Sequence, residues 1–168
     1  GLLEYIKKNH PKPDQWTEYR NSWDELNGKL RYLLLETTSK CNLKCPMCIH
    51  SVGYEQVEDM DINLFKIIKS NIQSLRIPSV GMNQTNEPLL DKNIFKKIRE
   101  IVDLEPVVDV MMNTNATLLT KEKSELLVKS GLHRLMVGFD AATEETFKLV
   151  RGASYNKIKQ NVLEFIET

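Results

Sequence analysis

The sequence lacks a long apolar run and lacks an excess of charge of either sign. No stretch of its 168 residues approaches the roughly 18 apolar residues of a membrane-spanning helix, and the N-terminal region lacks the apolar core of a signal peptide. Its 23 basic and 23 acidic side chains give a formal net charge of zero, which removes the usual electrostatic support for binding nucleic acid or an anionic membrane. These absences predict a cytoplasmic protein with one main domain.

Cysteine is also scarce, and its placement argues against a disulfide framework. The three cysteines, Cys41, Cys45 and Cys48, lie close together in one segment. A disulfide framework spreads its cysteines along the chain, and an odd number would leave one over. The pattern therefore also favours a cytoplasmic protein, and it gathers every thiol of the chain in one place.

The chain divides, by its patterns, into an extension over residues 1–30 and a main domain over 31–168. The extension is polar, and two tryptophans and a tyrosine at helical spacing predict a short amphipathic helix over about 14–26. The chain begins at Gly1 and stops at Thr168 inside a helical pattern. We therefore expect it to be part of a longer protein.

Short apolar runs alternate with helical patterns throughout the main domain. This alternation is typical of βαβ units with right-handed crossovers and a parallel sheet, so the predicted fold class is α/β. Four strands in the order 1-2-3-4 would make an arc rather than a closed barrel, with a fifth strand due where the chain stops. The expected strands are residues 32–37, 77–82, 107–112 and 135–139.

Each expected strand is followed by a helix on the outer face of the arc. The helices are expected over about 63–75, 91–102, 120–129, from Thr143 onward, and from Tyr155 to the end. Asp61 and Thr120 are candidate N-caps and Gly131 a candidate C-terminal stop. In the first of these helices the pattern predicts one apolar face, made of Leu64, Ile67, Ile68, Ile72 and Leu75.

The three cysteines directly follow the first expected strand. Thiolates at this density need a soft metal partner. Three of them can hold three corners of a cubic [4Fe-4S] cluster and leave one iron open for chemistry. Two other interpretations stay open: a zinc site completed by His50, or three unrelated thiols.

Four segments together resemble the radical SAM superfamily, whose hallmark is C-x3-C-x2-C after the first barrel strand. The resemblance covers about Tyr32 to Gly152 and is closest to the branch that often carries a further C-terminal cluster region of the SPASM or twitch type. The segments are ETTSKCNLKCPMC at 36–48, NQTNEPLL at 83–90 (family G-G-E-P-L-L), NTNATLLT at 113–120 (family T-N-G-x-L-L) and VGFDAATEETFKLVRG at 137–152.

The resemblance implies a partial (β/α) barrel and a defined chemistry. Cys41, Cys45 and Cys48 would ligate a [4Fe-4S] cluster, and its fourth iron would bind S-adenosylmethionine (SAM). The reduced cluster would split SAM and give a 5′-deoxyadenosyl radical, which takes hydrogen from a substrate. The electron would come from reduced flavodoxin or ferredoxin. The alternative function is a structural module that holds zinc or a degenerate cluster without radical chemistry.

The resemblance also assigns SAM contacts. Met47 would pack on adenine, and Glu87 would receive the α-amino group. Asn115 would lie near the ribose or carboxylate, and Arg151 would reach the carboxylate. The structural alternatives are a solvated loop acid for Glu87, a turn asparagine for Asn115 and a surface arginine for Arg151. The full set of expected SAM-binding residues is Met47, Asn86, Glu87, Asn115, Asp140 and Arg151.

Three departures from the family pattern involve four positions. Thr85 and Asn86 stand where the family has two glycines, Ala116 replaces the glycine of T-N-G, and Gly138 replaces a serine often found in the fourth strand. These changes alter possible SAM contacts and leave the cysteines untouched. Because parallel strands end at one edge, the cluster loop, Glu87, Asn115 and Asp140 are expected at one mouth.

Overall fold

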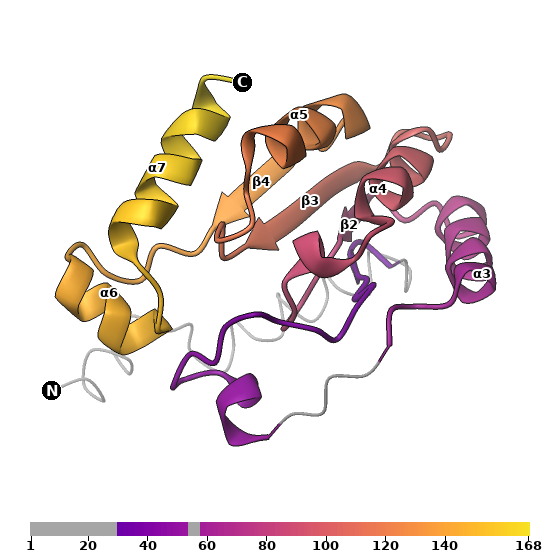
Figure 1. Cartoon of the computed structure of the whole chain (residues 1–168). Coiled ribbons are helices and arrows are strands. Elements are labelled where there is room, and N and C mark those ends of the chain that lie inside the picture. The colour runs from indigo at the N-terminus through magenta and orange to yellow at the C-terminus, as the bar shows by residue number, and fades with distance from the viewer. Residues whose placement is uncertain (1–29, 54–57) are drawn as a thin grey trace, which may run out of the picture. The chain divides into compact units, whose positions relative to one another are not determined.

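The computed structural model describes residues 30–53 and 58–168 (Figure 1). By its internal contacts the chain divides into two compact units, Gly1–Leu30 and Arg31–Thr168. The fold below is that of the second unit. The helix expected over 14–26 lies outside the described residues.

Four strands form one parallel sheet in the order β1-β2-β3-β4, as the alternating pattern predicts. Val80 of β2 pairs with Leu33 on one side and with Val110 on the other, and Met112 of β3 pairs with Leu135 of β4. The α/β class and the partial-barrel order are therefore confirmed. The strands are β1 (Leu33–Leu34), β2 (Ser79–Gly81), β3 (Asp109–Thr114) and β4 (Arg134–Val137).

The helices follow the strands along the chain, and their ends are set by local chemistry. The Asp61 side chain accepts hydrogen bonds from the backbone at the start of α3, and Thr120 and Thr143 cap α5 and α6 in the same way. Gly131 ends α5 at φ 77°, in the left-handed region where glycine carries no steric penalty. The elements are η1 (Ile49–Val52), α3 (Ile62–Ser74), η2 (Pro88–Leu90), α4 (Ile94–Val102), α5 (Lys121–Ser130), α6 (Glu144–Arg151) and α7 (Tyr155–Ile166).

The strand expected over 107–112 is shifted to Asp109–Thr114, and the strand expected over 77–82 is shorter, at Ser79–Gly81. Two other expected boundaries are wrong for identifiable reasons. The first strand is short and not fully buried: Tyr32 and Leu34 are exposed, and β1 lies at the edge of the described sheet. The helix expected from residue 91 begins at Ile94. The carboxylate of Asp91 instead accepts from Asn93 N at 2.8 Å, and this turn delays the helix.

The predicted apolar face of α3 is only partly right. Ile72 is completely buried and Ile68 packs against the core, but Leu64, Ile67 and Leu75 are exposed. Phe65, which was not predicted, is completely buried. Apolar residues occur on two neighbouring faces of α3, so the spacing i, i+3, i+4 fits either face and does not say which one is buried. Packing selected the face that carries the aromatic ring, and this face meets Lys97 of α4.

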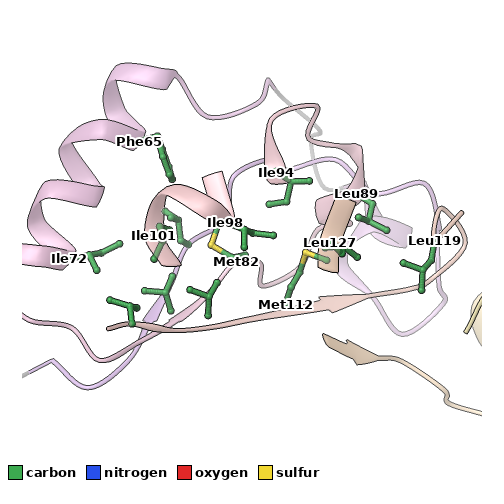
Figure 2. Packing of buried hydrophobic residues seen from close by; sticks show 14 of the residues in the cluster. Phe65, Ile72, Met82, Leu89, Ile94, Ile98, Ile101, Met112, Leu119 and Leu127 are labelled. Atoms are coloured by element: carbon green, nitrogen blue, oxygen red, sulfur yellow. The ribbon is translucent and has the colours of Figure 1, made fainter. Parts of the chain in front are cut away.

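The hydrophobic core lies between the sheet and the helices that cover it. Figure 2 shows Met82 and Met112 from the strand side meeting Ile98 and Leu127 from α4 and α5. All four side chains are at most 1% exposed, and each buried side chain of this size contributes about 1.5–3 kcal/mol. The helices that form this core do not cover the carboxyl ends of the strands, where a pocket lies. In the described ranges, no helix is long and apolar enough to cross a membrane.

Candidate functional site

A pocket of about 570 Å³ lies at the carboxyl ends of the strands. Loops following all four strands contribute to it, so it forms where a parallel arc gathers its strand ends. The structure brings every residue expected at the site into its lining: Cys41, Cys45, Met47, Cys48, Asn86, Glu87, Asn115, Asp140 and Arg151.

The cysteine loop is a compact turn with its thiols in the pocket wall. Cys48 N donates to Cys45 O at 2.8 Å, and the chain continues into η1 through Ser51 N and Cys48 O at 2.9 Å. Cys45 is 6% exposed, and the other two cysteines are half-buried. The three form no disulfide.

The three thiols are near enough to affect one another electrostatically. Burial raises the pKa of the Cys41 thiol, and a hydrogen bond from the Leu43 backbone opposes the rise. The negative charges of Glu87, Cys45 and Cys48 raise this pKa further. Such a cluster of potential thiolates is stabilised by a bound cation, because a coordinated metal holds thiolates deprotonated.

The two metal interpretations make different demands on the ligands. Zinc requires four ligands around one centre, whereas each thiolate of a cubic cluster binds a different iron. The proposed fourth zinc ligand, His50, is buried with its Nε2 at 2.9 Å from Thr85 O.

Glu87 is the most deeply buried acid of the pocket. It is 1% exposed, so the interpretation of Glu87 as a solvated loop acid is wrong. Its Oε1 accepts from Leu89 N at 3.1 Å and from Thr114 Oγ1 at 2.8 Å, and its Oε2 accepts from Asn115 N at 2.8 Å. Burial raises the pKa of the Glu87 carboxyl, and these three hydrogen bonds oppose the rise. A carboxylate has about four acceptor directions, so one remains for a ligand ammonium.

Asn86 offers a buried donor without a protein acceptor. Its Oδ1 accepts from Gln84 N at 3.2 Å, whereas its Nδ2 has no hydrogen-bond partner among the described residues. The residue is 8% exposed and lines the pocket. An unsatisfied buried amide costs about 1–3 kcal/mol, so the Asn86 amide is available to donate to an acceptor in the pocket.

Asn115 joins the cysteine loop to the loop after β3. Its Nδ2 lies 3.0 Å from Asn42 Oδ1 and 4.0 Å from Cys41 Sγ, and Asn42 Nδ2 donates to Thr117 Oγ1 at 2.7 Å. Asn115 is therefore more than a turn asparagine. Sequence reasoning missed Asn42, although its place directly after the first cysteine was a usable signal.

Arg151 and Asp140 form an ion pair at the pocket wall. The arginine side chain is 18% exposed, so the interpretation of Arg151 as a surface residue is wrong. Its Nη1 lies 3.9 Å from Cys45 Sγ.

Ala116, at the position of a family glycine, keeps a glycine-like backbone at φ 57° and is fully buried.

These residues fit a [4Fe-4S] cluster and SAM on the chemistry of their donors. Three thiols of one loop supply soft ligands, and two neighbouring N–H groups, from Asn115 and Arg151, approach their sulfur atoms. The open amide of Asn86 and the remaining acceptor direction of Glu87 match a ligand with a carboxylate and an ammonium group.

Comparison with known proteins agrees with this chemistry. The family model of the radical SAM superfamily matches residues 35–168. A GTP 3′,8-cyclase of Clostridium botulinum is 33% identical over 148 residues, which cover 83% of this chain and 44% of the relative. A GTP 3′,8-cyclase of Desulforamulus reducens is 26% identical and is covered to 45%. The chain thus spans less than half the length of these relatives.

Solved structures show the same fold. BtrN in complex with AdoMet and 2-DOIA has a TM-score of 0.62 and 24% identity, over 79% of this chain and 55% of BtrN. SuiB of Streptococcus suis bound to S-adenosylmethionine has a TM-score of 0.70 and 16% identity, over 99% of this chain and 41% of SuiB.

Proposed function

Because the chain belongs to the radical SAM superfamily, we propose that it is the cluster-bearing part of an enzyme that reductively cleaves S-adenosylmethionine. When bound, the [4Fe-4S] cluster and SAM supply a 5′-deoxyadenosyl radical that takes a hydrogen atom from the substrate. The observation that carries the proposal is one pocket that joins Cys41, Cys45 and Cys48 to the unsatisfied amide of Asn86 and the buried carboxylate of Glu87.

Each residue has a distinct part in this proposal. The three cysteines hold the cluster irons. Glu87 receives the ammonium group of SAM and, through Asn115 N, fixes the end of β3. The Asn86 amide donates to an acceptor of the same ligand.

Two further side chains shape the proposed SAM site. Met47 is 61% exposed at the pocket, so its thioether is available to pack on adenine. The half-buried pair of Arg151 and Asp140 closes the wall beside Cys45 and limits the access of water.

The electron donor and location follow from the same chemistry. A cluster that must be reduced needs a low-potential donor, and we propose reduced flavodoxin or ferredoxin. We propose a cytoplasmic location, because thiol ligands persist in a reducing compartment. The relatives named above are described with different compounds, namely GTP, 2-DOIA and a precursor peptide in another SuiB complex. The proposal therefore specifies hydrogen abstraction and not one substrate.

The test is anaerobic reconstitution with iron and sulfide, followed by SAM and a chemical reductant. The wild-type protein should bind iron and sulfide, absorb broadly in the visible range and release methionine and 5′-deoxyadenosine. Replacing Cys41, Cys45 and Cys48 together by alanine should abolish both cluster content and SAM cleavage. Full iron and sulfide content in that triple variant would contradict the assignment.

His50→Ala is the matched variant that separates the cluster from zinc. If a cluster is bound, this variant should retain iron and sulfide. If the site binds zinc through His50, the same variant should lose zinc affinity, and the wild-type protein should remain colourless after reconstitution. The second result would favour the structural module.

A further inference from the structure

Resting on the proposed function, we propose that Arg151 sets the reduction potential of the cluster, from a position that exists because residue 138 is glycine. This role is separate from a contact with SAM. It concerns the cluster itself, whether or not SAM is bound.

Two contacts of the guanidinium hold Arg151 beside the cluster loop. Its Nη1 lies 3.9 Å from Cys45 Sγ. Asp140 forms an ion pair with Nε, on the other side of the guanidinium. Arg151 is also the last residue of α6, so its backbone is held by the helix. The cation therefore has little freedom to leave the thiol.

Gly138 provides the space for this cation. A Cβ atom added at Gly138 would collide with Arg151 Nη2 and lie 3.1 Å from Cζ. The backbone of Gly138 is outside the left-handed region, and its N donates to Thr114 O at 3.2 Å as part of the strand edge. An alanine could adopt this backbone, so glycine is required here for room and not for conformation.

The charge arrangement has a predictable effect on electron transfer. On reduction the cluster accepts one electron from its donor and gains one negative charge. A cation and an N–H group beside a cysteine sulfur stabilise that added charge and raise the reduction potential. The effect is stronger here than on the surface, because Cys45 is 6% and the Arg151 side chain 18% exposed.

The experiment is a potentiometric titration of the reconstituted protein without SAM, in which the visible absorbance of the cluster reports its oxidation state. The absorbance of the triple cysteine-to-alanine variant, which carries no cluster, is subtracted as background. Arg151→Gln should shift the potential to a more negative value. Gly138→Ala should shift it in the same direction although the arginine is still present, because the added methyl group displaces the guanidinium. Arg151→Lys should restore part of the wild-type potential.

Lys148→Gln is the matched control. It removes one positive charge from the exposed side of the same helix, and it should leave the potential unchanged. Equal shifts in Lys148→Gln and Arg151→Gln would overturn the inference, because they would show a general effect of net charge.

The remaining outcomes separate this inference from the proposed function. A wild-type protein that forms no cluster would remove both. A normal cluster whose potential is the same in wild type, Arg151→Gln and Gly138→Ala would overturn the inference alone and leave Arg151 as a SAM contact. If Arg151→Gln does not assemble a cluster, the comparison of Gly138→Ala with Arg151→Lys decides. A larger negative shift of the potential in Gly138→Ala than in Arg151→Lys supports the inference, and any other result overturns it.

Discussion

Two buried regions of the molecule differ in what burial requires. The outer layer between the sheet and its helices is apolar, with Phe65, Ile98 and Met112 completely buried (Figure 2). The carboxyl edge of the sheet is almost as well buried but polar: Glu87 is 1% and Asn115 7% exposed. Burial of apolar area is favourable by itself, whereas a buried polar group is costly unless it is hydrogen-bonded. The polar edge is therefore the region whose burial must be explained by function.

One polar pair crosses into the apolar layer. Lys97 Nζ lies 2.8 Å from Asp91 Oδ2, with the two side chains 2% and 0% exposed, and 5.7 Å from the centre of the Phe65 ring. Both charges are satisfied within the protein, which distinguishes this pair from the open amide of Asn86. The ion pair is complete within the protein, whereas the Asn86 amide lines the pocket with its donor unused.

The largest effect is expected in the outer layer. Phe65→Ala should lower the free energy of unfolding by about 3–5 kcal/mol, because it leaves a cavity and removes the ring below Lys97. Denaturant unfolding measures this change. SAM affinity of the folded fraction should stay at the wild-type value, and a loss of affinity larger than the loss of folded protein would break the distinction between the two regions.

An intermediate effect is expected at Glu87, which belongs to both structure and site. Glu87→Ala leaves three donors without their acceptor, so stability should fall by about 1–3 kcal/mol. SAM affinity should fall about tenfold or more, since a charge-assisted hydrogen bond is lost. Equilibrium binding and unfolding would be measured on the same preparation. Unchanged SAM affinity would limit Glu87 to a structural role.

The smallest effect on stability is expected at Asn86. Asn86→Ala removes an unused donor and the Oδ1 that accepts from the backbone of the exposed Gln84, so the free energy of unfolding should fall by about 0.5–1.5 kcal/mol. SAM affinity should still fall by about three- to tenfold, as one neutral hydrogen bond to the ligand is lost. Asn86→Asp is the control, because it keeps the acceptor for Gln84 N and replaces the donor. Wild-type SAM binding in both variants would show that the amide does not face the ligand.

Local patterns predicted much of the fold. The N-caps at Asp61, Thr120 and Thr143 and the glycine stop at Gly131 depend on residues a few positions apart, so the sequence shows them directly. The parallel order of the strands follows from the alternation of strands and helices, because a strand joined to the next by a right-handed crossover usually lies beside it in the sheet. The face of α3 could not be predicted in this way, since it depends on which side packs against the rest of the core.

The sequence by itself determined the chemistry that this protein carries: three thiols on one loop after a strand, followed by polar residues at the ends of the next strands. The short spacing of the three cysteines keeps them together, because residues of one turn stay close however the rest of the chain packs. Only the tertiary structure decided that Asn42 contacts Asn115 and that Arg151 occupies the space left by Gly138. These pairs are far apart in the chain, and which atoms meet is set by how the sheet twists and the helices pack, which no local pattern records.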